Sequence, residues 1–257
     1  MKIGVIGAGA YGTALGEILL AKGHEITYYD PAITDKFVED VLWDAEMILM
    51  VAPSSAVPEL LPQLKKDVPI IVATKGLLTD DLFSEFEDVM VLSGPGFADD
   101  IKAHKQTYLT VSDPRLMDLF RTDYIDFDKT KDRRGILMCG ALKNVYAILA
   151  GYLNLKPGDS NYDDFIGGVA DEMQSILFMN GCERDTVNRY CGIDDLKLTC
   201  NLPSRNYEFG HELASNPDYK PEKTVEGLST LKRIRAGEIV LPDEIKYLQQ
   251  LMDIIKE

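Results

Sequence analysis

The chain has 257 residues, of which 46% are hydrophobic and 9% aromatic. This is long enough for a sizeable core in one or two domains, and the composition excludes a disordered chain. The formal net charge is -15. A field of that sign repels nucleic acid and anionic membranes, so neither is expected as a partner. An anionic substrate must therefore be collected by a local cationic pocket.

The 4 cysteines are expected to be reduced thiols of a cytoplasmic protein, and no metal site is expected. None forms a CxxC pair. Cys182, Cys191 and Cys200 are evenly spaced, but the spacing matches no zinc pattern and the histidines lie far away in sequence. The N-terminus leads directly into a strand-like segment, so we expect no signal peptide. No apolar run reaches membrane-spanning length.

A glycine-rich turn is the first motif in the chain. It follows a predicted strand, Lys2–Ile6, and precedes a predicted helix, Thr13–Lys22. Its sequence, Gly7-Ala8-Gly9-Ala10-Tyr11-Gly12, has the form G-x-G-x-x-G. The glycines allow a tight turn and close approach of a pyrophosphate, and the helix N-terminus supplies free N–H groups with a positive dipole end. This context favours dinucleotide binding.

An acidic residue lies where such a site binds the adenosine ribose. The second predicted strand, Glu25–Tyr29, ends at Asp30. A carboxylate at this position accepts hydrogen bonds from the ribose hydroxyls. No arginine follows Asp30 to receive a 2′-phosphate, so the sequence favours NAD over NADP. A glycine turn that merely packs a strand against a helix does not explain Asp30.

Strands and helices alternate up to about residue 127, which predicts a Rossmann-type doubly wound sheet. Further strands are predicted at Glu46–Val51, Val68–Ala73, Val89–Ser93, Tyr108–Ser112 and Tyr124–Phe127. The intervening helices are predicted at Asp35–Trp43, Ser55–Lys65, Leu82–Glu87 and Pro114–Arg121.

Two segments follow directly after predicted strands, where open parallel sheets bind their ligands. Lys75 lies between Thr74 and Gly76, and the sequence Gly94-Pro95-Gly96-Phe97 follows the next strand. The commonest position for a lysine is a solvated loop. The strand-end position nevertheless favours a ligand-facing Lys75.

A lysine interrupts the most apolar stretch of the chain. Nearly every residue from Ile136 to Leu153 is apolar or small except Lys143 and Asn144, which predicts a buried helix. Burial lowers the pKa of a lysine towards neutrality, where it exchanges a proton with a substrate oxygen. The alternative is a Lys143 that extends its ammonium to water past apolar neighbours. This stretch alone does not decide between them.

The second half of the chain is predicted to be all-α. After the central helix, further helices are predicted at Asp163–Asn180, Asp185–Tyr190, Glu208–Ser215, Thr224–Arg235 and Asp243–Lys256. The segment from Asn201 to Asn206 is polar and turn-prone. A charged link near Asp128–Arg133 separates a dinucleotide-binding domain, 1–130, from a helical substrate domain, 131–257.

The ordered motifs resemble the NAD(P)-dependent sn-glycerol-3-phosphate dehydrogenases. They are Gly7–Leu15, Thr74–Leu77, Leu92–Ala98, Gly140–Val145, Asp195–Leu196 with Thr199–Cys200, Ser204–Asn206 and Val225–Gly227. Many dehydrogenases share the first motif, whereas the ordered set is specific. The resemblance implies reversible hydride transfer between glycerol 3-phosphate and dihydroxyacetone phosphate, a step that supplies the backbone of phospholipids and belongs to carbohydrate metabolism. It also suggests a homodimer.

The resemblance implies a role for each matched residue. Lys143 would be the acid/base on the C2 oxygen, with Asp195, Thr199 and Lys75 as its catalytic partners. The cofactor would be held by Gly7, Gly9, Ala10, Tyr11, Gly12, Asp30, Lys75, Ala98 and Glu226. The substrate would be held by Lys75, Gly94, Gly96, Asn144, Ser204, Arg205 and Asn206, with Arg205 and Asn206 on its phosphate. An arginine provides the fixed donor fork that a phosphate needs.

The chain departs from the family pattern in several places. It is short, Gly96 replaces a usual serine, and Asp194 replaces a usual glycine beside the site. An arginine usual near Asp163–Gly168 is absent. Two alternatives therefore stay open: a related two-domain dehydrogenase for another small hydroxy acid or phosphorylated alcohol, and a non-catalytic NAD(H)-responsive binding protein. Lys143 together with Asp195 argues against the second, because a sensor needs no proton relay.

Overall fold

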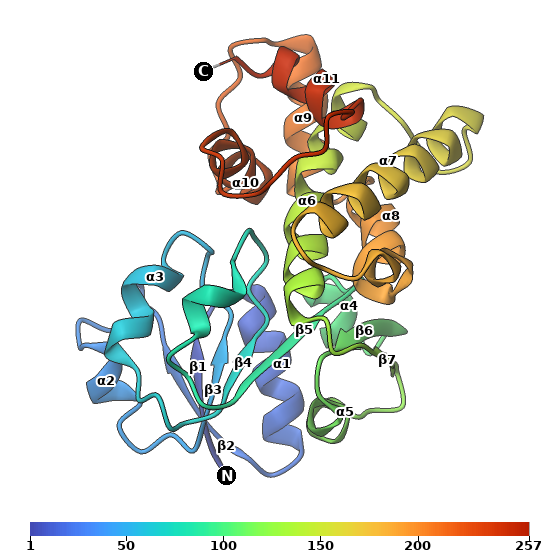
Figure 1. The fold of residues 1–257 in the computed structure, drawn as a ribbon. Helices are drawn as coiled ribbons and strands as arrows, with labels where there is room; N and C mark the ends of the chain where they lie inside the picture. The colour runs from blue at the N-terminus through green and yellow to red at the C-terminus, as the bar shows by residue number, and fades with distance from the viewer. Residues whose placement is uncertain (257) are drawn as a thin grey trace.

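Seven strands form one mixed β-sheet in the N-terminal half of the computed structural model, which describes residues 1–256 (Figure 1). The strands are β1 (Lys2–Ile6), β2 (Glu25–Tyr29), β3 (Met47–Met50), β4 (Ile70–Val72), β5 (Val89–Ser93), β6 (Thr107–Val111) and β7 (Ile125–Lys129). Their order in the sheet is β2-β1-β3-β4-β5-β6-β7. All neighbours are parallel except β5 and β6, which pair antiparallel. The predicted strands and the Rossmann-type sheet are confirmed.

The central strands are apolar on both faces because both faces of the sheet are covered. In β3, Ile48 and Met50 face one hydrophobic core, whereas Met47 and Leu49 face the other. One core contains side chains of α1 (Ala10–Ala21) and α5 (Pro114–Phe120). The other continues into the helical half of the chain without a break. The sheet and the helices therefore share a core.

The connecting helices are shorter than the sequence pattern predicts. The predicted helix at Asp35–Trp43 is reduced to α2 (Val38–Val41), and Ser55–Lys65 to α3 (Val57–Leu60) with a 3₁₀ turn. Pro62 explains the second case, because proline has no N–H group and disfavours a helical residue before it. In place of the helix predicted at Leu82–Glu87, the structure has a 3₁₀ turn at Asp80–Phe83. The unpredicted α4 (Ala98–Lys102) is too short to show helical periodicity.

The C-terminal half is all-α, as predicted, and is built around one central helix (Figure 1). Its helices are α6 (Arg133–Tyr152), α7 (Ser160–Met179), α8 (Asp195–Thr199), α9 (Arg205–Ser215), α10 (Glu226–Arg235) and α11 (Tyr247–Ile254). A 3₁₀ turn, Arg184–Asn188, and a π-helical segment, Tyr190–Asp194, precede α8. The segment predicted as a polar turn, 201–206, contains the first residues of α9, so that prediction is partly wrong.

Helix α6 is buried along nearly its whole length. Every residue from Gly135 to Gly151 is buried. By length and composition α6 could cross a membrane, but 94% of its apolar window is buried inside the protein. It is therefore the core helix around which the other C-terminal helices pack, as the sequence pattern predicts.

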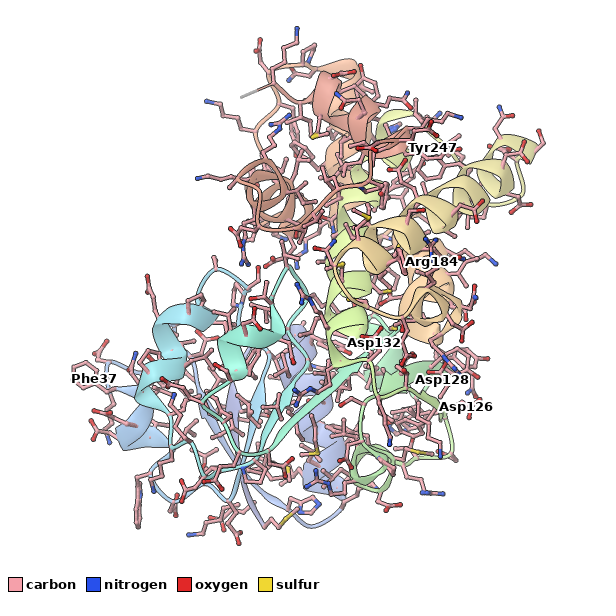
Figure 2. The ribbon with its side chains drawn as sticks, in the orientation of Figure 1. Phe37, Asp126, Asp128, Asp132, Arg184 and Tyr247 are labelled. Atoms are coloured by element: carbon pink, nitrogen blue, oxygen red, sulfur yellow. The ribbon has the colours of Figure 1, made fainter. Side chains whose placement is uncertain are left out.

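Asp132 fixes the start of α6 at the junction between sheet and helices (Figure 2). Its carboxylate caps the helix by accepting a hydrogen bond from the N–H of Gly135 at 2.8 Å. It also accepts bonds from the N–H of Glu183 at 2.9 Å and the hydroxyl of Thr186 at 2.6 Å. One side chain thus ties α6 to the loop that leads towards α8.

A buried carboxylate also fixes the C-terminal helix. Glu172, on α7, accepts hydrogen bonds from the Tyr146 hydroxyl at 2.8 Å and from the N–H groups of Lys246, Tyr247 and Leu248 at 2.6 to 2.8 Å. The first turn of a helix has N–H groups without partners inside the helix. Glu172 supplies those partners from another helix and so docks α11 on the core.

We predict that Glu172→Ala lowers the free energy of unfolding by about 3 kcal/mol, because buried donors lose a charged acceptor. Urea denaturation of the variant and the wild type measures this loss. Asp171→Asn is the matched control, since Asp171 is the exposed neighbour on the same helix. Equal midpoints for Glu172→Ala and the control would contradict the docking role.

Candidate active site

The glycine-rich turn between β1 and α1 has the geometry of a pyrophosphate site. A Cβ at Gly12 would lie 2.0 Å from the carbonyl oxygen of Gly7, so the turn closes only with glycine there. A Cβ at Gly9 would meet nothing within 4 Å, which leaves open space above the turn. Gly9 caps α1 without a side-chain hydrogen bond, and the first turn holds no acidic residue. The helix N-terminus is therefore open to an anion.

Asp30 lies beside this turn, at the end of β2. Its carboxylate accepts hydrogen bonds from the N–H of Ala8 at 2.9 Å and the N–H of Ala32 at 3.0 Å. The first bond ties the end of β2 to the glycine turn. The turn and the carboxylate together fit the pyrophosphate and ribose of a dinucleotide.

Lys143 and Asp195 form a buried ion pair between α6 and α8. Each side chain is only 2% exposed. The alternative in which Lys143 extends its ammonium to water is therefore wrong. The carboxylate of Asp195 compensates the buried charge of Lys143.

Thr199 lies on the other side of Asp195. Its hydroxyl donates a hydrogen bond to the Asp195 carbonyl at 2.6 Å and lies 3.5 Å from the second carboxylate oxygen. The structure thus brings together three of the four predicted catalytic residues in one hydrogen-bonded chain, Lys143–Asp195–Thr199.

The π-helical segment Tyr190–Asp194 carries the chain directly into Asp195, and the sheet holds it in place. The N–H of Cys191 donates to the hydroxyl of Thr110, on β6, at 2.8 Å. The N–H of Tyr190 donates to Asp128, on β7, at 3.1 Å; Figure 2 shows Asp128 between Asp126 and Asp132 along the junction. A π-helix is rare and is often found at functional sites. Neither Thr110 nor Asp128 was predicted as a support of this segment, because both lie far from it in the sequence.

Lys75, the fourth predicted catalytic residue, follows β4 and points to the same region. Its ammonium donates to the Gly96 carbonyl at 3.3 Å and lies 4.2 Å from the centre of the Tyr11 ring. Burial, and then the positive charge of Lys143, lower the pKa of Lys75 to about 8. Lys75 therefore changes charge close to physiological pH.

Arg205 begins α9, at an open cationic position. It is exposed, and no carboxylate pairs with it in residues 1–256. Ser204 is the N-cap residue of α9, with its hydroxyl facing the N–H of Tyr207 at 3.5 Å. A helix N-terminus with a free arginine is suited to an anion such as a phosphate.

The two predicted asparagines bind each other. The Asn206 amide donates to the Asn144 side-chain oxygen at 2.9 Å and accepts from the N–H of Gly227 at 2.9 Å. The Asn144 amide donates to the Gly140 carbonyl at 3.1 Å. These bonds connect α6, α9 and α10, so both side chains have a structural role that the sequence did not indicate.

Glu226, the first residue of α10, reaches back to the sheet half of the chain. Its carboxylate accepts a hydrogen bond from the buried hydroxyl of Ser54 at 2.9 Å. Burial raises the pKa of Glu226, while Ser54 and Arg205 oppose this shift. Ser54 follows β3, so this bond joins the sheet half of the chain to α10.

The loop after β5 supplies the other predicted residues. Gly94 lies directly after β5, and Gly96 accepts the bond from Lys75. Ala98 opens α4, and the structure gives it no contact with the ion pair. A cavity of about 790 Å³ lies beside this loop, lined by Gly96, Asp194 and others, but not by Lys143 or Asp195.

No group of three or more His, Cys, Asp or Glu residues within 1–256 is placed to hold a metal ion. All four cysteines are free and buried. The evenly spaced Cys182, Cys191 and Cys200 therefore belong to the core.

A Rossmann-type sheet with an open glycine turn, followed by a helical domain with a buried lysine–carboxylate pair, defines a two-domain nicotinamide-dependent oxidoreductase. Models of the NAD-dependent glycerol-3-phosphate dehydrogenases match this chain twice, the N-terminal part at residues 32–117 and the C-terminal part at 132–256. The chain belongs to this family. The glycine turn lies before the matched segments, so its assignment depends on the geometry above.

Relatives and solved structures agree with this assignment. A glycerol-3-phosphate dehydrogenase (NAD(P)+) of Neorickettsia sennetsu is 30% identical over an alignment that covers 90% of this chain and 82% of the relative. A glycerol-3-phosphate dehydrogenase (NAD(P)+) of Maridesulfovibrio salexigens is 29% identical over an alignment that covers 100% of this chain and 94% of the relative. The crystal structure of a Coxiella burnetii glycerol-3-phosphate dehydrogenase has the same fold, with a TM-score of 0.79 at 23% identity over 98% of this chain and 94% of that chain.

We predict that two alanine substitutions in the glycine turn have different effects, one on NADH binding and the other on stability. Gly9→Ala should fold with an unchanged melting temperature but bind NADH at least tenfold more weakly, because the new methyl occupies the open space. Gly12→Ala should lose stability, because its Cβ meets backbone. NADH fluorescence titration and thermal melting measure both. Gly9→Ala with wild-type NADH affinity would contradict the pyrophosphate assignment.

Proposed function

We propose that this protein catalyses reversible hydride transfer between NAD(H) and sn-glycerol 3-phosphate or dihydroxyacetone phosphate. The observation that carries the proposal is the buried Lys143–Asp195 pair, at the junction where the glycine turn, Lys75 and Arg205 converge. The bound nicotinamide accepts or donates the hydride. The residues of the chain bind the substrate and move its proton.

Lys143 acts as the acid/base on the C2 oxygen. In the reducing direction its ammonium gives a proton to the oxygen as the carbonyl becomes an alcohol, and in the oxidising direction its amine takes the proton back. Asp195 holds the ammonium in place, and Thr199 holds Asp195. Water is excluded from the pair because both side chains are buried.

Arg205 and the N-terminus of α9 bind the phosphate of the substrate. Arg205 has no carboxylate partner in residues 1–256, and the charge of Lys75 adds to the local positive field, whereas that of Lys143 is compensated by Asp195. This collects a dianion on a protein whose net charge is -15. Ser204 and Asn206 support this turn, and Gly94 and Gly96 contact the substrate from the loop after β5.

The cofactor is NAD in preference to NADP. Asp30 supports this preference, because its carboxylate accepts bonds from ribose hydroxyls and repels a 2′-phosphate. Gly7, Ala10 and Tyr11 form the pyrophosphate turn, and Glu226 closes over the nicotinamide end from α10. Ala98 lines the cofactor side of the loop after β5.

The enzyme acts in the cytoplasm as a homodimer, without nucleic acid or membrane partners. The four reduced cysteines support a reducing compartment, and the acidic net charge opposes both polyanionic partners. The two domains are 1–130 and 131–257, since β7 ends at Lys129 and α6 begins at Arg133. The product serves as the backbone for phospholipids.

Oxidation of NADH at 340 nm with dihydroxyacetone phosphate tests the proposal. We expect turnover by the wild type, slower turnover with NADPH, and a loss of at least 100-fold in kcat for Lys143→Met, as is typical for removal of an acid/base. Thermal melting checks that the variant folds, and Lys197→Met, an exposed lysine on α8, is the control. Tight NADH binding without turnover on any hydroxy substrate would favour the sensor alternative instead.

The pKa of Lys75, about 8, predicts a pH-dependent KM. Above pH 8 Lys75 loses its proton and its attraction for the substrate, while the substrate phosphate, with a second pKa of about 6, stays doubly charged. KM for dihydroxyacetone phosphate should therefore rise between pH 7.5 and pH 9.5, by about tenfold. In Lys75→Met the KM should be high at pH 7.5 and change little. A flat wild-type KM across this range would remove Lys75 from the substrate site.

A further inference from the structure

Tyr11 has a buried hydroxyl without a hydrogen-bond partner in the described part of the chain. It is the second residue of α1, so its backbone belongs to the glycine turn. Its side chain leaves the turn and extends under Lys75, whose ammonium lies 4.2 Å from the ring centre. The turn motif explains the backbone of Tyr11 but gives no reason for its hydroxyl.

Other buried tyrosine hydroxyls are satisfied. Tyr146 donates to Glu172 at 2.8 Å, Tyr162 to the Lys197 carbonyl at 2.8 Å, and Tyr207 to the Leu155 carbonyl at 2.7 Å. A buried polar group without a partner destabilises the fold. A bound ligand can supply the partner that the Tyr11 hydroxyl lacks.

The surroundings of the hydroxyl indicate which ligand. Burial raises the pKa of Tyr11, and the charge of Asp195 raises it further, so the hydroxyl keeps its proton and lies close to the catalytic pair. The carboxylate oxygens of Asp195 already face Lys143 and Thr199. The ammonium of Lys75 is a donor and cannot accept a hydrogen bond from the hydroxyl. The hydroxyl therefore lies close to the ion pair and has no acceptor among these neighbours.

We propose that the Tyr11 hydroxyl is a substrate-binding group that donates a hydrogen bond to a carbonyl or hydroxyl oxygen of the three-carbon substrate, while its ring positions the Lys75 ammonium. This inference rests on the proposed function. One residue thus serves both ligands: its backbone N–H faces the cofactor pyrophosphate, and its hydroxyl faces the substrate. The site selects substrates that carry an oxygen at this point, because others leave the hydroxyl unsatisfied.

Tyr11→Phe tests the proposal, because it removes the hydroxyl and keeps the ring against Lys75. We expect the KM for dihydroxyacetone phosphate to rise by about tenfold, as for the loss of one hydrogen bond at a buried site. The Kd of NADH should stay unchanged, and the melting temperature should not fall, since no hydrogen bond within the protein is lost.

Tyr146→Phe is the matched control, because it also removes one buried hydroxyl. It should lower the melting temperature, since it takes a donor from Glu172, and leave the KM as in the wild type. The opposite pattern in the two variants separates a substrate contact from a packing effect.

Two results would overturn the assignment of Tyr11. An unchanged KM in Tyr11→Phe, with an active wild type, would remove the hydroxyl from the substrate site. A weaker Kd for NADH with an unchanged KM would assign it to the nicotinamide instead. A wild type that does not turn over dihydroxyacetone phosphate would overturn the proposed function, and the Tyr11 assignment with it.

Discussion

The structure depends on one buried pair of charges, Lys143 on α6 and Asp195 on α8. Each side chain is 2% exposed. Neither charge could be buried alone, because removing a single ion from water costs several kcal/mol. The pair therefore requires α6 and α8 to pack so that Lys143 and Asp195 face each other. It also explains how the most apolar helix of the chain tolerates a lysine at its centre.

The position of that pair is set by both halves of the chain. Thr110 and Asp128, on the sheet, hold the π-helical segment that leads into Asp195. The Ser54–Glu226 bond joins the sheet to α10, and one hydrophobic core runs from the sheet into the helices. The ion pair thus lies where the two halves of the chain meet. A change in how the two halves pack would therefore shift Asp195 relative to Lys143.

Much of this was predictable from the sequence, for physical reasons. Local spacing encodes the glycine turn, the strand ends and the buried helix, because each is made by neighbouring residues. The predicted strands and the all-α second half are confirmed for the same reason. Helix lengths around Pro62 were overestimated, and the five-residue helices α4 and α8 were missed, because they are too short for periodicity. Contacts between distant segments, such as Cys191–Thr110 and Asn206–Asn144, leave no local pattern at all.

The central claim is that Lys143 and Asp195 act as one unit, and a double-mutant cycle tests it most directly. The measurement is kcat for reduction of dihydroxyacetone phosphate by Lys143→Met, Asp195→Asn and the double variant, all shown to be folded. If the two groups act together, the double variant should be no slower than the slower single variant, within a few-fold. A double variant that shows the product of the two single losses would mean that they contribute independently, which would contradict the account.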